Sequence, residues 1–309
     1  MQAFGIMFHH FRDAVHPDGQ GALSADEFDE LLHSVGIERI LPPQEWFERA
    51  QRERLSGDEV CLTFDDNLRC QFDVARPVMR RYGLTAFWFI ATGTWSVRPP
   101  RLEVYRAFRT RHYAALDDFY RDFENLVTAS DEGPRVVARL RRFDPANYLA
   151  EFPFYTDADR RFRFIRDEAL GPCDYERLMD ALMAARGADA TELAAGLWMD
   201  QDCVHALCRE GHWIGLHSHT HPTRLAELSE RDQRREYRDN ATRLMAVTGR
   251  RALVASHPCN SYDARTLRVL RDLGVRMAFR ANAALPGGGP LELPRVDHAV
   301  LRKELSLCA

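Results

Sequence analysis

The chain has 309 residues, 45% of them hydrophobic, and a formal net charge of -4. This length and composition allow one large domain or two modest ones, and we expect a single domain over residues 1–309. The small negative charge gives no general attraction to nucleic acid or to an anionic membrane. Nowhere in the sequence do about 18 apolar residues follow one another, as a membrane-spanning helix requires. We therefore expect neither a nucleic-acid partner nor a membrane span.

The cysteines and the amino-terminal residues give an expectation for the cellular compartment of the protein. The seven cysteines are an odd number and form no CxxC pair, which argues against a disulfide framework and against a cysteine zinc site. Residues 1–11 lack the basic segment and the apolar stretch of a signal peptide. Both observations predict a cytoplasmic protein.

Six short apolar runs rich in Val, Ile and Phe alternate with helical patterns, which is typical of βα units and a parallel sheet. Several runs are almost continuously apolar, as expected of strands that are covered on both faces. Ser24 and Gly83 mark the start of one predicted helix (25–35) and the end of another (75–82). The predicted strands are residues 4–8, 60–64, 85–90, 213–216, 252–256 and 275–279.

Between Gly93 and Leu207 the strand pattern is replaced by a polar, aromatic stretch. Residues 102–127 and 175–197 have helical periodicity, and we predict a helical insertion over residues 94–207. Its first arginines would meet an anionic carrier such as a nucleotide or a lipid diphosphate, or would simply form a solvated helix face, which is the favoured interpretation. These arginines are Arg98, Arg101, Arg106, Arg109 and Arg111.

The first candidate site lies where a predicted strand ends in two adjacent acids, Asp65 and Asp66. Neighbouring strand residues point to opposite faces, but the chain turns at a strand's carboxyl end, so both acids can reach one pocket. One carboxylate can then bind a metal ion while the other accepts a proton from water. A solvated turn with an acidic helix cap is the alternative interpretation.

The second candidate site is a group of three histidines, His217, His219 and His221, directly after another predicted strand. Neutral imidazoles are the commonest nitrogen ligands of zinc and similar ions. Two of them with one carboxylate would form a ligand set that leaves positions open for water and substrate. Surface histidines in a loop are the alternative.

Residues 63–66 (Thr-Phe-Asp-Asp) and 217–222 (His-Ser-His-Thr-His-Pro) closely resemble the first two motifs of the polysaccharide deacetylases, the NodB homology domain of carbohydrate esterase family 4. The predicted helix and strand over residues 77–89 also look like that family. The resemblance covers roughly residues 1–95 and 205–300. It implies an α/β fold, a distorted (β/α) barrel, with the helical insertion lying outside the family pattern.

The resemblance also implies roles for the two motifs. Asp65 corresponds to the general base, and Asp66, His217 and His221 correspond to the ligands of one divalent metal ion. His219 is not a ligand in this pattern. Zinc is the first choice for the ion, and cobalt, nickel and iron suit the same ligands.

Residues 255–262 resemble a third family motif, in which the backbone N–H after a proline stabilises an oxyanion. This assigns the oxyanion contact to the N–H of Cys259. The arginine that many members carry before this proline is missing here, and Arg295 is our candidate to orient the general base. A late Leu-x-His motif that supplies the general acid is missing as well. His298 is the candidate proton donor, with a water molecule or the neighbouring Asp297 as alternatives.

Two further histidines, His9 and His10, end the first predicted strand. If the strands are parallel, the loop after this strand lies at the same rim of the barrel as both candidate sites. Either histidine would then contact the substrate, although ordinary buried histidines are the more common case.

Together these residues predict a metal-dependent hydrolase that removes an N-acetyl or other N-acyl group from a sugar, either as a small molecule or linked to a carrier. The sugar follows from the resemblance alone. Two other functions stay open. One is another amide hydrolase on the same fold, such as a deformylase; the other is a carbohydrate-binding protein that kept the metal but lost turnover, as the missing arginine and Leu-x-His suggest.

Overall fold

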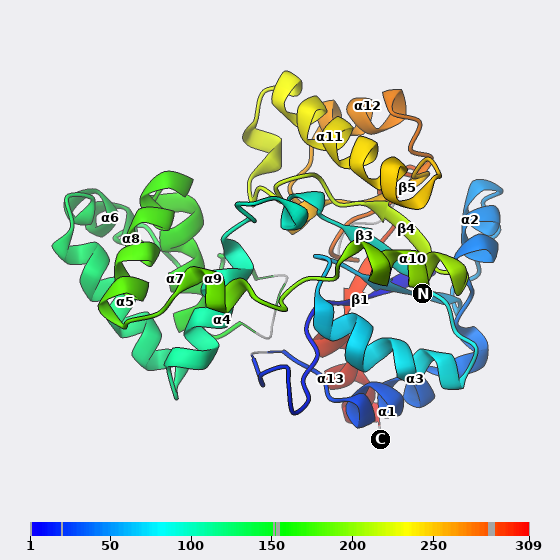
Figure 1. Ribbon diagram of the computed structural model, residues 1–309, viewed down its shortest axis with the longest axis horizontal. Coiled ribbons are helices and arrows are strands. Elements are labelled where there is room, and N and C mark those ends of the chain that lie inside the picture. The colour runs from blue at the N-terminus through cyan, green and yellow to red at the C-terminus, as the bar shows by residue number, and fades with distance from the viewer. Residues whose placement is uncertain (1, 20, 151, 153–154, 284–287, 309) are drawn as a thin grey trace. The chain divides into compact units, whose positions relative to one another are not determined.

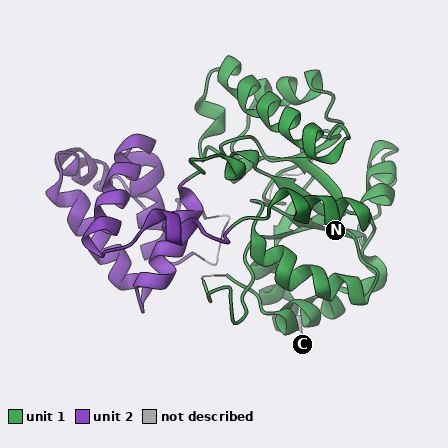
Figure 2. Ribbon diagram, viewed as in Figure 1, with its two compact units in different colours: residues 1–100, 198–309 green, residues 101–197 purple. Residues whose placement is uncertain are grey.

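The computed structural model describes residues 2–19, 21–150, 152, 155–283 and 288–308 (Figure 1). The chain forms two compact units (Figure 2). Unit 1 comprises residues 1–100 and 198–309, and unit 2 comprises residues 101–197. None of the helices in the described residues is long and apolar enough to cross a membrane.

Unit 1 is built around seven parallel strands in the order β6-β5-β4-β3-β2-β1-β7. All six predicted strands are present, and three of them begin two residues later than predicted. Strand β7 is not among the predicted ones, because two of its three residues are charged. The strands are β1 (Phe4–Phe8), β2 (Val60–Phe64), β3 (Phe87–Ile90), β4 (Trp213–Leu216), β5 (Val254–Ser256), β6 (Met277–Phe279) and β7 (Arg295–Asp297).

The segment that leads into β7 joins the two edges of the sheet. On one side, the backbone N–H of Arg280, just after β6, donates to the carbonyl of Leu293 at 3.0 Å. On the other side, the N–H of Gly5 in β1 donates to the carbonyl of Pro294 at 3.0 Å. The seven strands thus form a nearly closed barrel, which confirms the predicted (β/α) barrel fold.

Helices cover the outside of this barrel, with α11 packed beside α12 and α1 beside α3 (Figure 1). Helix α1 has the predicted bounds, because Ser24 and Glu27 form a capping box at its start. The helices of unit 1 are α1 (Ala25–Val35), α2 (Pro43–Gln51), α3 (Arg76–Arg81), α10 (Gln201–Arg209), α11 (Glu230–Thr248), α12 (Ala264–Asp272) and α13 (His298–Cys308).

Alternation along the strands separates two apolar layers. In β3, Trp88 and Ile90 belong to the cluster under the helices, whereas Phe87 and Phe89 belong to the smaller cluster that fills the barrel. The interior is tightly packed at Gly215 of β4, where a Cβ atom would lie 2.5 Å from the Phe89 ring. Because the strands are buried on both faces, they appear in the sequence as continuous apolar runs.

The regular secondary structure in the described residues of unit 2 is helical, and residues 141–150 form turns and loops. The two long predicted helices are each divided, the first where Tyr113 and Ala115 adopt extended backbone angles and the second at Gly187, whose φ is +65°. Its helices are α4 (Leu102–His112), α5 (Leu116–Ala129), α6 (Gly133–Leu140), α7 (Asp157–Phe164) with the π-helical turn η4 (Ile165–Ala169), α8 (Pro172–Ala185) and α9 (Ala190–Ala194).

Unit 2 lies within the predicted insertion of residues 94–207, and the single-domain organisation of the chain stays a prediction. One expectation for this region is wrong. Arg109 on α4 is only 7% exposed, so it does not belong to a solvated helix face.

We predict that His212 makes unit 1 less stable in mild acid. The ring is 5% exposed, and its Nδ1 accepts a hydrogen bond from the N–H of Ala86 at 3.0 Å. Burial lowers the pKa of His212 from 6.5 to about 4, with Glu210 opposing part of the shift. In the unfolded chain the His212 ring becomes protonated as the pH falls below 6.5, whereas in the folded chain the same ring stays neutral until about pH 4. The free energy of unfolding should therefore fall by up to about 3 kcal/mol between pH 6.5 and pH 4.

The variant His212→Asn keeps an acceptor near the Ala86 N–H but has no ionisable ring. Urea unfolding at pH 7 and pH 4.5 should show a smaller loss of stability in this variant than in the wild type. The exposed His205→Asn serves as the matched control and should lose as much as the wild type. Equal losses in all three proteins would contradict the prediction.

Candidate active site

The candidate residues gather at the carboxyl ends of the parallel strands of unit 1. Asp65 and Asp66 directly follow β2, His217 directly follows β4, and Ser256 ends β5. Arg295 reaches the same place from the start of β7, with its side chain running through the barrel interior. This rim is where parallel barrels carry their functional groups, because loops from several strands converge there.

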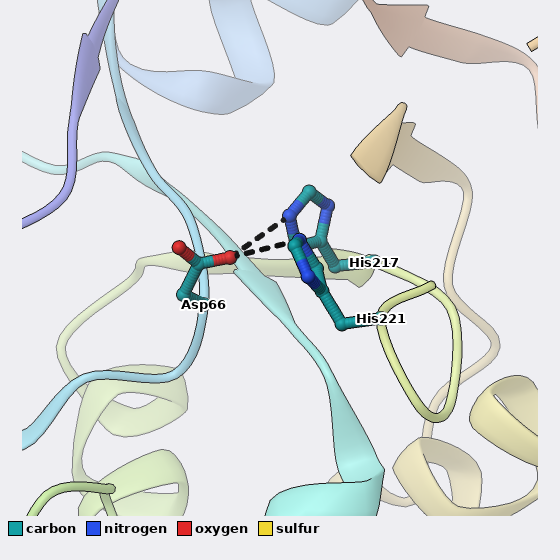
Figure 3. Close-up of side chains that lie close together, drawn as sticks. All are labelled: Asp66, His217 and His221. Carbon is teal, nitrogen blue, oxygen red and sulfur yellow. Dashed lines mark ion pairs between the residues drawn. The ribbon is translucent and has the colours of Figure 1, made fainter. Parts of the chain in front are cut away.

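Asp66, His217 and His221 point toward one another (Figure 3). Their nearest ligand atoms lie within 4.8 Å of one another, and Nε2 of each histidine is 3.2 Å from Oδ1 of Asp66. That oxygen is buried and accepts no hydrogen bond from any residue that the structure describes. Two ring nitrogens therefore approach one carboxylate oxygen without hydrogen-bond geometry, an arrangement that fits the ligands of a divalent cation.

The contacts of the ring of His217 determine which of its nitrogens carries the proton. Its Nδ1 lies 3.1 Å from the backbone carbonyl of Ser256, and a carbonyl can only accept a hydrogen bond. In the neutral ring Nδ1 is therefore the protonated nitrogen, which leaves the lone pair of Nε2 directed toward Asp66 and available to a metal ion. His219 lies apart from this cluster, since its Nδ1 is 2.9 Å from Oγ1 of Thr92.

Helix α11 fixes the loop that carries both candidate histidine ligands. Asn240 accepts a hydrogen bond from the N–H of His217 at 3.0 Å and donates to the carbonyl of the last residue of β3 at 2.8 Å. One turn earlier, the carboxylate of Glu236 accepts hydrogen bonds from the N–H groups of His219 and Thr220 at 3.0 and 2.7 Å. Neither residue stands in a motif, and their spacing of four on the helix after the histidines is the one available signal.

The same loop is held from its other side by Gly93, which follows β3. The N–H of Gly93 donates to the carbonyl of His219 at 2.7 Å. A Cβ atom at position 93 would lie 2.5 Å from that carbonyl oxygen. The backbones can approach this closely only because position 93 has no side chain.

Asp65 is held by Arg295, whose side chain is fully buried. Nη1 and Nη2 donate to the two carboxylate oxygens at 2.8 Å each, and the hydroxyl of Ser256 donates to Oδ2 at 3.1 Å. Burial raises the pKa of Asp65, but the guanidinium of Arg295 and the nearby His217 outweigh it and bring the pKa below its ordinary value. The structure thus provides an ionised carboxylate in one fixed orientation.

Asp66 is also ionised. Burial opposes its charge, but the adjacent imidazoles of His221 and His217, in their protonated form, outweigh the desolvation and hold the pKa of Asp66 well below its usual range. Two neighbouring carboxylates therefore remain charged for different reasons, one through a guanidinium and the other through two imidazoles.

Cys259 lies in the loop after β5, within the short helix η6 (Pro258–Asn260). Beside it, the buried ring of His257 stacks on Tyr262 with centroids 4.0 Å apart and donates from Nε2 to the carbonyl of Leu291 at 2.8 Å. Burial lowers the pKa of His257 to about 4, although the hydrogen bond to Leu291 opposes it. The loop is thus fixed by a neutral histidine.

Backbone strain is concentrated in the three loops of the candidate site, which follow β2, β4 and β5. Among the described residues, eight non-glycine residues have positive φ, and six of them belong to these loops. A left-handed conformation costs about 1–2 kcal/mol for such residues, so the surrounding contacts must hold it in place. The six residues are Asp66, Asn67, Ser218, His221, Cys259 and Asn260.

His298, the predicted proton donor, and His9, a predicted substrate contact, lie in different surroundings. His298 opens α13, is 5% exposed and stacks on Phe8, with ring centroids 5.7 Å apart. Burial lowers the pKa of His298, with the adjacent Asp297 opposing the shift. His9 follows β1, its side chain is 30% exposed, and its Nε2 lies 3.9 Å from Oδ2 of Asp66. Of the two, His9 is the one that lies close to a candidate metal ligand, Asp66.

Comparison with known proteins agrees with the resemblance of the sequence to the polysaccharide deacetylases. A family model described as polysaccharide deacetylase matches residues 167–278. This range includes the histidine ligands and the loop of Cys259, whereas Asp65, Asp66 and Arg295 lie outside it. No curated protein sequence matches the chain significantly.

Solved structures resemble the protein over nearly its whole length. The Streptococcus pyogenes deacetylase PplD, solved in complex with acetate, has a TM-score of 0.58 and 15% identity, covering 99% of this chain and 98% of its own. IcaB from Ammonifex degensii has a TM-score of 0.57 and 16% identity, and the match covers 96% of this chain and 91% of IcaB. A de-N-acetylase from Aggregatibacter actinomycetemcomitans has a TM-score of 0.56 and 10% identity, covering 98% and 99%. Such low identities establish the shared fold, and together with the family model they confirm the predicted resemblance of this chain to the polysaccharide deacetylase family.

Proposed function

We propose that the protein is a metal-dependent hydrolase that removes an N-acetyl group from a sugar or from a sugar-containing glycan precursor, free or carrier-linked. The observation that carries this proposal is the convergence of Asp66, His217 and His221 beside a carboxylate, Asp65, that an arginine orients. The choice of an N-acetylated sugar rests on the family resemblance and on similar structures named as deacetylases. The cytoplasmic location stays a prediction.

Asp66, His217 and His221 would hold one divalent ion. Zinc suits two imidazoles and one carboxylate, and cobalt, nickel and iron are alternatives. When bound, the ion would polarise the acyl carbonyl and make water more acidic. The proton on Nδ1 of His217, directed at the Ser256 carbonyl, keeps Nε2 available as a ligand.

Asp65 would act as the general base. Its Oδ2 lies 3.8 Å from Nε2 of His217, so the carboxylate is next to the ligand set without belonging to it. Arg295 donates to both oxygens and keeps the group ionised, and Ser256 donates to Oδ2, which leaves a lone pair of Oδ1 available for a proton from water. Asp65 would take that proton as water attacks the acyl carbon.

The remaining steps need a donor to the oxyanion and a proton for the leaving nitrogen. Pro258 has no N–H, so the first backbone donor after His257 in this loop is Cys259, and we assign it to the oxyanion. His298 stays the candidate proton donor, and His9 joins it because of its distance to Asp66. The products would be acetate and an amino sugar.

Variants of the two neighbouring acids should separate binding from chemistry. Asp65→Asn should keep one bound metal ion per chain but lose activity by about 10²- to 10⁴-fold, because the base is gone and the ligands remain. Asp66→Ala should lose both metal and activity. Acetate release from a panel of N-acetylated amino sugars and metal analysis of the purified proteins would measure this.

The exposed Asp58→Asn is the matched control and should behave as the wild type. Full activity and full metal content in Asp66→Ala would refute the proposal. A wild type that releases formate from N-formyl sugars much faster than acetate would instead identify a deformylase.

Replacing the guanidinium group of Arg295 should reduce turnover without removing the metal. Arg295→Lys keeps a positive charge but cannot make two parallel hydrogen bonds to Asp65, so the base loses its orientation. We expect kcat to fall by about 10²-fold with unchanged metal content. The exposed Arg276→Lys, beside β6, is the control. An unchanged kcat in Arg295→Lys would show that orientation of Asp65 is not needed.

The proton donor can be identified by comparing His298→Gln with His9→Gln. The variant that removes the donor should lower kcat by about 10²- to 10⁴-fold at unchanged metal content, whereas the other should keep most of the activity. The exposed His205→Gln, on α10, is the control. If both variants keep wild-type kcat, neither histidine donates the proton.

A further inference from the structure

A cavity of about 70 Å³ lies wholly within unit 2, between α4, α5, α7, η4 and α8. This volume is well above the roughly 10–15 Å³ that a single water molecule requires. Four arginines contribute to its lining, and Glu103 is the single carboxylate among the lining residues. The arginines are Arg106 and Arg109 of α4, Arg163 of α7 and Arg166 of η4.

Arg109 is the most buried of these four, with 7% of its surface exposed. Within the described residues, no carboxylate lies at ion-pair distance and no acceptor is hydrogen-bonded to it; its guanidinium carbon lies 5.9 Å from the ring centre of Phe162. Burial and the neighbouring Arg106 lower the pKa of Arg109 to about 10, which still leaves it charged at neutral pH. A buried cation with no counter-ion is strongly unfavourable.

The surrounding arginines add to this positive charge. The guanidinium of Arg166 also lies 5.9 Å from the Phe162 ring, and it forms an ion pair with the adjacent Asp167 at 2.6 Å. The guanidinium of Arg163 lies 4.0 Å from the ring centre of Tyr155. For Arg109 and Arg163, aromatic rings rather than carboxylates are the contacts among the described residues, so these two arginines bring positive charge to a cavity with partly apolar walls.

We propose that this cavity binds a phosphoryl group, either as free phosphate or as the phosphomonoester of a larger ligand. Guanidinium groups match phosphate oxygens in pairs of parallel hydrogen bonds. A phosphoryl group offers at least three oxygens and up to two charges, so it can engage several arginines at once, whereas a carboxylate offers two oxygens and one charge. The small volume suits the phosphoryl group alone, so the rest of a larger ligand would lie outside the cavity.

The test uses the full chain with its metal and measures binding of inorganic phosphate by titration calorimetry and thermal unfolding. Phosphate should bind to the wild type and raise its melting temperature, whereas sodium acetate at the same ionic strength should not. Arg109→Met should weaken phosphate binding about tenfold or more. The same variant should have a higher melting temperature without phosphate, because it removes an uncompensated buried charge.

Two variants separate this site from other effects. Arg121→Met removes an exposed arginine of α5 and should keep wild-type phosphate binding. Asp66→Ala should keep it as well, so a failure of the proposed hydrolase site would not affect the result. A hexose 1-phosphate that binds more tightly than phosphate would identify a phosphorylated sugar as the source, and equal or weaker binding would identify free phosphate. Phosphate binding that is absent, or that is unchanged in Arg109→Met, would overturn the proposal.

Discussion

The buried ion pair between Asp65 and Arg295 is the interaction on which the rest of unit 1 depends. Taking both charges out of water is unfavourable, and the two short parallel hydrogen bonds offset that loss only in a fixed geometry. Arg295 also donates from Nε to the carbonyl of Arg280 at 2.9 Å and from Nη2 to the hydroxyl of Ser256 at 2.8 Å. One guanidinium therefore connects the ends of β2, β5 and β6 with β7, where the barrel comes nearest to closing.

The loop of residues 217–221, which carries the two proposed histidine ligands, is stabilised by hydrogen bonds from a helix rather than by an ion pair. Its two histidines stand on a backbone with left-handed residues at Ser218 and His221, which is unfavourable in isolation. The compensating contacts come from Glu236 and Asn240 on α11, which lie on one face of the helix because they are four residues apart. The strand positions the first ligand, and the helix determines the path of the chain to the second.

The sequence predicts most of unit 1, because its strands are buried on both faces and appear as apolar runs between capped helices. It does not predict β7, since a buried arginine such as Arg295 cannot be distinguished in the sequence from an exposed one. The breaks at Tyr113 and Gly187 in unit 2 depend on local backbone angles that helical periodicity does not encode.

The candidate site divides in the same way. The acidic pair and the histidines can be predicted because their residue types and order resemble a family. The roles of Glu236 and Asn240 depend on tertiary contacts, and so does the burial of Arg109, whose neighbours from α7 and α8 lie more than fifty residues away. Such groups acquire their surroundings only when distant helices pack together.

The close approach of Gly93 to His219 bears on how the proposed metal site is prepared for an ion. The loop between the two ligands is fixed by β3 on one side and by Glu236 on the other, so its width is set before any ion arrives. A preformed site of this kind loses little conformational freedom on binding. Calcium takes six to eight oxygen ligands at about 2.3–2.6 Å, so two imidazoles and one carboxylate suit it less well than they suit ions that bind nitrogen at about 2.0–2.1 Å. The missing side chain at position 93 thus allows the loop of the proposed ligands to be fixed in advance.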